Sequence, residues 1–382
     1  MKARPAAPNT RTIAHACGVS HVTVSRALRD DPHVLPETKA RILATARRLG
    51  YQPNPLVQAF AAQARRGRGV SAGCNLAWLV SDPDPTRTRD PRPWLRPYLE
   101  GARDRASALG YTLDTDIDAH GLTDVQLARI LRTRGIRAVI LPHLAWFGRL
   151  PYQDPALVTV GIGENPVPTP MHTVQPDYFR NVTRAFDHLL ALGYRRIGYC
   201  EHVFQTVLSQ GSEWGAFLWN QQRLPAARRL PALTGLRPGL RSAERADREH
   251  FLRWFKKHRP DVILTTTYHV ADHLRAAGIS IPAEVGVAHL SLAEETPGWS
   301  GIDHHPRSLG VAAVDLASAH LLRNEGGIPT TPKFSRLPGV WVHGNTTRPP
   351  TQPPGAPGHL DPVAPLSHGQ DWITETFFPH LA

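Results

Sequence analysis

The sequence predicts two kinds of structure in one chain: an all-α, helix-turn-helix headpiece, followed by an α/β body of two doubly wound parallel-sheet subdomains. Three observations support this prediction. Residues 1–72 contain twelve Lys/Arg and three Asp/Glu, so they hold a net charge of +9 out of +12 for all 382 residues. This basic part has short helical patterns joined by a glycine turn, and strand and helix patterns alternate in the part that follows. A basic module joined to a nearly neutral body is typical of nucleic-acid-binding proteins.

The composition excludes several classes of protein. Hydrophobic residues make up 41% of the chain, yet no apolar run is long enough to span a membrane, and the first residues lack the apolar stretch of a signal peptide. The three cysteines, Cys17, Cys74 and Cys200, form no Cys-x-x-Cys pair, which argues against a disulfide framework or a zinc site. We therefore expect a cytoplasmic protein without a membrane segment.

The headpiece is expected to contain three short helices. The first runs from Asn9 to Cys17 and ends at the flexible Gly18. Ser20 is a suitable N-cap for the second, His21 to Leu28, and Pro36 opens the third, which stops before Gly50. The expected core comprises Ile13, Ala14, Val24, Leu28, Ile42, Leu43, Ala46 and Leu49.

Four segments are expected along the chain. Residues 1–53 form the headpiece, residues 54–72 a further helix (Leu56 to Ala64) and a basic linker, and residues 73–348 the body. Residues 349–382 contain eight prolines, which predicts a disordered or loosely attached tail.

The body shows the alternation of strand and helix that is typical of parallel sheets. Thr123 and Gln126 form a capping box at the start of one helix, and Asp177 caps another. The expected strands are Asn75–Ser81, Tyr111–Asp116, Ala138–Leu141, Leu157–Ile162, Arg196–Cys200, Val262–Thr266 and Val285–Leu290. The expected helices are Pro97–Leu109, Thr123–Arg134, Asp177–Leu192, Gly211–Gln221 and Ala243–His258.

The headpiece pattern resembles the lac-repressor (LacI/GalR) family of bacterial transcription regulators. The resemblance covers roughly residues 9–66 and rests on Ile13-Ala14, Gly18-Val19-Ser20, Thr23 to Leu28, Val34, Pro36-Glu37-Thr38, Ile42, Ala46, Leu49-Gly50-Tyr51 and Pro53-Asn54-Pro55. It implies that His21, Val22 and Arg26 read base edges in the major groove. It also implies phosphate contacts, which fix register, from Ser20, Thr23, Ser25 and Arg29.

The segment after the headpiece matches the family's hinge helix, which lies in the minor groove. The residues implied there are Asn54, Leu56, Val57 and Phe60. Phe60 stands where the family places a leucine wedge between the central base pairs, and phenylalanine is an accepted wedge residue. The alternative is that Phe60 packs on the partner helix of a dimer.

The body resembles the family's effector domain, which has a periplasmic-binding-protein-like fold. Leu192 to Ile197 and Arg259 to Val262 carry this weaker resemblance, together with Ile281-Pro282, Val285 to Val287 and Leu309-Gly310. It implies one subdomain of about residues 73–165 plus 300–335 and another of about 176–292. The chain is expected to cross from one subdomain to the other near residues 163–176, 291–303 and 324–333. Such crossings are where a hinge bends.

The expected effector cleft departs from the family pattern. Asp177 keeps an acidic position, but Ser212, Thr267-Tyr268 and Ser291 replace an arginine, an Asn-Asp pair and an acid. A sugar pocket needs several hydrogen bonds to hydroxyl groups, so these losses argue against a conventional sugar effector. Trp94, together with Trp146, Trp214 and Tyr268, is either part of an aromatic ligand site or part of the core.

The sequence contains no complete motif for an enzyme, a metal site or a cofactor site. His269 and His273 have the spacing of a helix-borne metal site, but valine replaces the usual glutamate and no third ligand is evident, so a solvated helix face is expected. Gly161-Ile-Gly163 lacks the third glycine of a dinucleotide-binding turn. No catalytic residue, metal or cofactor is expected.

The sequence thus predicts a sequence-specific transcription regulator that is not an enzyme. It is expected to repress transcription and to bind a near-palindromic double-stranded operator as a homodimer. It is also expected to respond to a small-molecule effector of unknown identity. The alternative is a small-molecule sensor whose basic headpiece binds DNA without sequence preference. Such binding would rest on phosphate contacts alone, which give non-specific affinity.

Overall fold

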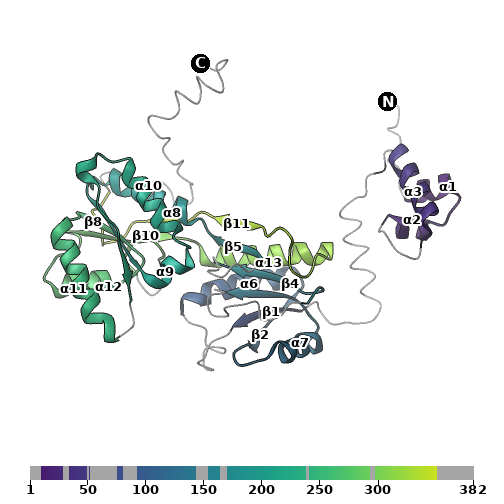
Figure 1. The fold of residues 1–382 in the computed structure, drawn as a ribbon, viewed down its shortest axis with the longest axis horizontal. Helices are drawn as coiled ribbons and strands as arrows, with labels where there is room; N and C mark the ends of the chain where they lie inside the picture. Colours follow the sequence, from purple (N-terminus) through teal and green to yellow (C-terminus); the bar gives the residue numbers. More distant parts are fainter. Residues whose placement is uncertain are drawn as a thin grey trace, which may run out of the picture. The chain divides into compact units, whose positions relative to one another are not determined.

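The computed structural model describes residues 10–28, 34–49, 51, 75–80, 93–142, 154–163, 170–237, 241–292 and 297–350. It divides the chain into two compact units, Met1–Ser71 and Ala72–Ala382, and each is described here by itself (Figure 1). The expected helix from Leu56 to Ala64 and the expected tail beyond residue 350 lie outside the described residues. Among the described helices, none is both long and apolar enough to cross a membrane.

The first unit contains the three expected helices, α1 (Thr10–Cys17), α2 (His21–Ala27) and α3 (Pro36–Arg48). Gly18 has a φ of +63°, a backbone conformation that glycine adopts without strain, and it turns the chain between α1 and α2. Ile13, Val24 and Ile42 are fully buried and supply one core residue from each helix. Of the expected core, Ile13, Ala14, Val24, Ile42 and Ala46 are buried, whereas Leu28, Leu43 and Leu49 are half-buried.

The second unit contains two six-stranded sheets with matching topology. The first has the order β11-β5-β4-β3-β1-β2, and the second has the order β12-β10-β9-β8-β6-β7. All strand pairs are parallel except β10 with β12. The first sheet comprises β1 (Asn75–Val80), β2 (Thr112–Asp118), β3 (Ile136–Pro142), β4 (Val158–Ile162), β5 (His172–Pro176) and β11 (Phe334–Leu337). The second comprises β6 (Ile197–His202), β7 (Leu233–Leu236), β8 (Val262–Thr265), β9 (Gly286–His289), β10 (Ser300–Asp303) and β12 (Val340–Val342).

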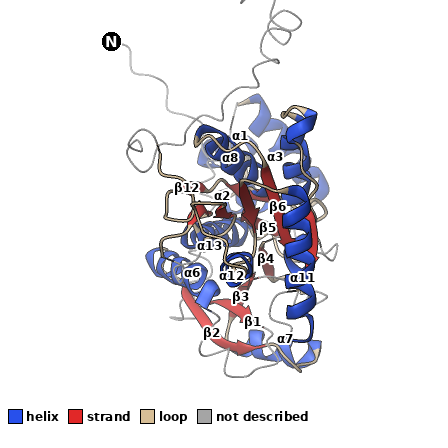
Figure 2. Cartoon of the chain, turned by 90° about the vertical axis from the view of Figure 1, so that its left-hand side faces the viewer, coloured by secondary structure: helices blue, strands red, loops and turns tan. Residues whose placement is uncertain are grey.

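Helices cover both faces of each sheet, as parallel sheets require (Figure 2). On the first sheet, α6 (Arg96–Ala108) and α13 (Pro306–Arg323) pack on one face, and α7 (Asp124–Thr133) packs on the other. On the second sheet, α8 (Tyr178–Ala191) and α10 (Ser212–Gln222) face α11 (Arg241–His258) and α12 (His269–Ala276) across the strands. The shorter elements are α9 (Val203–Leu208), η1 (Pro93–Leu95) and η3 (Ala226–Arg228).

Two glycines let α6 and α13 approach closely. A Cβ atom at Gly310 would lie 2.0 Å from the Tyr98 carbonyl oxygen, and one at Gly101 would lie 2.0 Å from that of Arg307. Real Cβ contacts are never that short, so only glycine allows the two backbones to touch. Across this contact, the Arg105 Nε donates to Asp315 at 2.6 Å.

The sheet order corrects two of the expected boundaries between subdomains. Residues 163–176 were expected to form a crossing, yet β5 lies within them and pairs with β4 in the first sheet. Residues 300–335 were expected in the first subdomain, yet β10 pairs with β9 and β12 in the second sheet. Each strand is only four or five residues long, so hydrophobic periodicity does not reveal it. The crossings instead fall at Asp177, at 304–305 and at 338–339.

Candidate nucleic-acid interface and effector site

Helix α2 separates a buried face from an exposed one. Val24 and Ala27 are buried, whereas His21, Val22 and Arg26 are exposed. Val22 is 46% exposed, although valine is apolar, and it adds no packing to this core. The three residues expected to read bases therefore lie together on the exposed face of α2, away from Val24 and Ala27.

Ser20 fixes how α2 begins. Its hydroxyl oxygen accepts a hydrogen bond from the Thr23 N–H at 3.1 Å, and it lies 2.9 Å from the Thr23 hydroxyl. This confirms the N-cap predicted from the sequence. Ser20 is exposed, and Thr23 and Ser25 are half-buried. The hydroxyls of Ser20 and Thr23 thus lie side by side at the start of the helix.

The described part of this unit is strongly basic. Its only acidic residue is Glu37, whereas its basic residues are Arg11, Arg26, Lys39, Arg41, Arg47 and Arg48. A surface of this charge attracts a polyanion regardless of sequence. The remaining residues expected to contact DNA, Arg29, Asn54, Leu56, Val57 and Phe60, lie outside the described residues.

In the body, the carboxyl ends of the second sheet bring three of the expected cleft residues together. Thr267 and Tyr268 follow β8, and Ser291 follows β9. The Tyr268 hydroxyl donates to the Ser291 carbonyl oxygen at 3.1 Å, and the Thr267 N–H donates to the Thr265 hydroxyl at 3.1 Å. The carboxyl ends of parallel strands are the usual ligand-binding edge of such sheets.

Tyr268 is held there by other rings. It stacks on His289 with ring centroids 3.9 Å apart and planes only 3° from parallel, and it meets Trp299 edge-on at 4.9 Å. The sequence prediction missed His289 and Trp299 as neighbours of Tyr268. The position of His289 at the end of a predicted strand is the one signal that could have indicated it. The aromatic group at this edge is therefore a packed unit that includes a histidine.

Three imidazoles at this edge are neutral near pH 7. His202 ends β6, His289 ends β9, and His304 follows β10. Burial, together with the nearby His202 and His304, lowers the pKa of His289 to about 3. Burial likewise lowers the pKa of His202 to about 4 and that of His304 to about 4. A ligand at this edge therefore meets imidazoles as neutral hydrogen-bonding groups.

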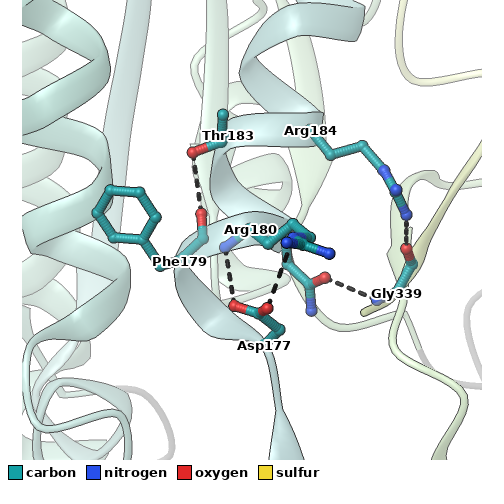
Figure 3. A network of polar contacts seen from close by, with 7 residues as sticks. Asp177, Phe179, Arg180, Thr183, Arg184 and Gly339 are labelled. Carbon is teal, nitrogen blue, oxygen red and sulfur yellow. Dashed lines mark hydrogen bonds and ion pairs between the residues drawn. The ribbon is translucent and has the colours of Figure 1, made fainter. Parts of the chain in front are cut away.

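Asp177 lies at the first crossing and serves the fold (Figure 3). Its carboxylate accepts from the Arg180 N–H at 3.1 Å and lies 3.7 Å from the Arg180 Nε, which confirms the predicted helix cap. Its own N–H donates to the Leu337 carbonyl oxygen at 2.8 Å. The acid that the resemblance assigned to the pocket is thus engaged at the N-terminus of α8.

The other expected cleft residues are more dispersed. Ser212 is the first residue of α10, whereas Trp94 is a half-buried residue of η1 in the first subdomain. Trp214 is 37% exposed, so it belongs to neither a closed core nor a closed pocket. His273 is buried against Phe251, with ring centroids 5.9 Å apart, so the expectation of a solvated face is wrong for this histidine. Within the described residues, no group of three or more His, Cys, Asp or Glu side chains is arranged to hold a metal ion.

The crossings are tied together by polar contacts that the sequence did not predict. The Gly339 N–H donates to the Asn181 side-chain oxygen at 2.7 Å, and the Arg184 guanidinium donates to the Gly339 carbonyl oxygen (Figure 3). Between the subdomains, the Tyr98 hydroxyl of α6 lies 2.7 Å from Nε2 of His304. Polar contacts thus join α8 to the crossing at 338–339 and α6 to the crossing at 304–305.

Comparisons with known proteins agree with both units. Residues 11–54 match the family described as bacterial regulatory proteins, lacI family, and residues 186–347 match the periplasmic binding protein-like domain. The chain is 42% identical over 65 residues to the HTH-type transcriptional regulator AglR of Rhizobium meliloti, which is 17% of each chain. It is 30% identical over 190 residues to the HTH-type transcriptional regulator PtxS of Pseudomonas plecoglossicida, which is 48% of this chain and 51% of that protein. The match thus spans about half the length of PtxS and a sixth of AglR.

Solved structures share the fold. The lac repressor dimer bound to operator and the anti-inducer ONPF superposes with a TM-score of 0.51 at 17% identity, over 90% of this chain and 99% of that chain. The complex of the transcriptional regulator CelR with cellobiose gives 0.50 at 18% identity, over 89% and 99%. Taken with the helix-turn-helix unit and the paired parallel sheets, the two family matches show that the chain joins a helix-turn-helix domain of the lacI family of bacterial regulatory proteins to a periplasmic binding protein-like domain.

Proposed function

We propose that this protein is a sequence-specific DNA-binding transcription regulator with a ligand-responsive body. It acts in the bacterial cytoplasm as a homodimer on a near-palindromic operator and represses the genes there, without an enzymatic step. A twofold dimer has to meet two half-sites, which is why the operator mirrors the symmetry of the protein.

One observation carries the proposal: the exposed face of α2. His21, Val22 and Arg26 project from a helix whose other side is fixed by the core and by the Ser20 cap. A guanidinium at such a position can donate two hydrogen bonds to one guanine. Because the surrounding unit is basic, phosphate contacts add affinity, and the α2 face adds the sequence preference.

The body supplies the switch. A small molecule binds between the subdomains at the carboxyl edge of the second sheet, near Tyr268 and the three neutral histidines. The missing arginine, amide and acidic groups argue against a conventional sugar. Ligand-dependent closure about the crossings changes the spacing of the two hinge segments, and so decides whether both headpieces and Phe60 engage the operator together.

Selection of binding sites from a random pool of double-stranded DNA, at near-physiological salt, tests the proposal with the full chain. The expected result is an enriched near-palindrome. A Phe60→Ala variant, selected in parallel, should keep the half-sites and lose the preference at the central step, because only the wedge contacts that step.

Absence of any enriched sequence, with retained binding to random DNA, would contradict the proposal. It would favour the second candidate function, a small-molecule sensor whose basic head binds DNA through phosphates alone. The loss of the expected pocket groups is the observation that favours this candidate.

A further inference from the structure

An unusually apolar surface lies on one side of the second subdomain. Three large side chains of α10 are exposed, Trp214 by 37%, Leu218 by 44% and Trp219 by 42%. Three further exposed apolar residues come from α8 and α9. We name the whole set the α9–α10 apolar face, which comprises Phe179, Val203, Val207, Trp214, Leu218 and Trp219.

Two features group these six side chains. Val203 and Val207 lie four residues apart on α9, as do Trp214 and Leu218 on α10, so each pair lies along one side of its helix. Phe179 meets Trp219 edge-on, with ring centroids 6.0 Å apart, and joins α8 to the face. Contiguous exposed apolar surfaces of this kind usually mark a binding site, because water solvates them poorly.

Two arginines lie beside this face. The Arg223 guanidinium lies 5.9 Å from the ring centroid of Trp219, and Arg180 directly follows Phe179. Each is paired with an aspartate at a single contact, Arg223 with Asp187 at 2.8 Å and Arg180 with Asp177 at 3.7 Å. A partner with apolar side chains and a few carboxylates would therefore fit this surface.

The chain itself contains such a segment. Residues 371–378 read Asp-Trp-Ile-Thr-Glu-Thr-Phe-Phe, with four large apolar side chains, two acids and no basic residue. The twenty preceding residues, 351–370, contain five prolines and no Phe, Trp or Tyr. Large apolar residues are thus concentrated in one short acidic stretch beyond a spacer that lacks aromatic side chains.

The spacer, residues 351–370, starts on the subdomain that carries the apolar face and is long enough to reach that face. The Arg348 N–H donates to the Tyr194 hydroxyl at 2.8 Å, and Tyr194 lies between α8 and β6, so the chain leaves from the subdomain that carries the face. Twenty residues extend to roughly 65–70 Å at most. A folded body of about 280 residues has a radius of gyration of roughly 19 Å. The α9–α10 apolar face, on the subdomain from which the spacer leaves, is therefore within reach.

We propose that residues 371–378 bind the α9–α10 apolar face of the same chain, with Trp372, Ile373, Phe377 and Phe378 covering its aromatic side chains and Asp371 and Glu375 beside Arg180 and Arg223. A short tether gives a local concentration on the order of 1 mM, so a weak intrinsic dissociation constant of about 0.1 mM is enough to keep the face covered roughly nine-tenths of the time. This docking is independent of DNA binding.

Hydrogen exchange on full-length protein tests the proposal in both directions. A triple variant of the tail (Trp372→Ser, Phe377→Ser and Phe378→Ser) changes no described residue, so the body keeps its fold. We expect the amides of residues 203–223 to exchange up to about tenfold faster in this variant. Conversely, Leu218→Asp should speed exchange in residues 371–378. The matched control is Val125→Asp, at an equally apolar position of α7 that is 79% exposed, and it should leave both segments unchanged.

Docking within one chain predicts two results. Protection from exchange is lost in both variants, and the protection of the wild type is the same at about 1 µM and 50 µM protein. Protection that increases with concentration would overturn the proposal in favour of a second copy of the chain as the occupant. Equal exchange in wild type and both variants would overturn it as well.

Discussion

The helix-turn-helix unit and the carboxyl edge of the second sheet carry their candidate functional residues in different ways. On α2, the side chains expected to touch DNA are exposed, and the core is built from the residues between them. At the sheet edge, Tyr268, His289 and Ser291 hold one another in place. A binding surface made of exposed side chains can be changed at little cost to the fold, whereas an edge made of packed side chains cannot.

The body should show the largest dependence on packing. Gly310→Ala puts a Cβ atom against the Tyr98 carbonyl oxygen, so the free energy of unfolding should fall by about 3 kcal/mol or more. Gly215→Ala in α10 is the matched control, because a Cβ there meets nothing within 4 Å, and it should stabilise by about 0.5–1 kcal/mol. All nine tryptophans lie beyond residue 71, so tryptophan fluorescence during urea unfolding reports on this unit alone. Equal stability of the two variants would contradict the close helix contact.

The neutral histidines should make the body sensitive to acid. Burial holds the pKa of His202, His289 and His304 below the value of about 6.5 that applies in the unfolded chain. As the pH falls below 6.5, the unfolded chain therefore binds protons that the folded chain excludes. Stability should fall by up to about 1.4 kcal/mol per histidine per pH unit between pH 6.5 and 4.

The same tryptophan signal, measured in urea at pH 7.0 and 5.5, checks this expectation. A His289→Gln variant cannot take up the proton at that position, so its pH dependence should be shallower by up to about 1.4 kcal/mol per pH unit. A body whose unfolding midpoint is the same at both pH values would contradict the neutral state of these side chains.

In the headpiece, the cap is where the fold and the binding surface meet. Ser20→Ala removes the acceptor for the Thr23 N–H and should destabilise α2 by about 1 kcal/mol. Hydrogen exchange at the Thr23 amide measures this directly. Arg41→Ala, at an exposed position of α3, is the control and should change the exchange by less than about 0.5 kcal/mol. An unchanged Thr23 amide in Ser20→Ala would show that the cap does not stabilise the helix.

A smaller effect is expected from Tyr268→Phe, which keeps the ring stacked on His289 and removes only the hydroxyl bonded to Ser291. Loss of one such bond should lower the free energy of unfolding by about 0.5–1.5 kcal/mol. Urea unfolding followed by tryptophan fluorescence measures it. A neutral or stabilising effect would mean that the edge is not held together as the contacts indicate, and would weaken the contrast with α2.

Sequence reasoning predicted local features well. The N-caps at Ser20 and Asp177 and the capping box of Thr123 and Gln126 are all present, because each depends on residues three positions apart. The three headpiece helices and most strands were predicted from periodicity for the same reason. The headpiece motif also placed His21, Val22 and Arg26 on one exposed face, as the structure has them.

Features that depend on distant residues were not predicted. Strands β5 and β10 are short, and their sheet is decided by pairing with β4 and β9 rather than by their own pattern. The stacking of Tyr268 on His289 joins residues 21 positions apart, and the contact of Gly310 with Tyr98 joins residues more than 200 apart. Nothing in the composition around these residues indicates their partners.

The central claim is that α2 reads sequence, and the ratio of affinities for a selected operator and for random DNA tests it most directly. With the full chain at fixed salt, Arg26→Ala should lose about 1–3 kcal/mol of binding to the operator and much less to random DNA, whereas Arg29→Ala should weaken both alike. Equal losses on operator and random DNA from Arg26→Ala would contradict the claim, since that residue would then act only as a positive charge.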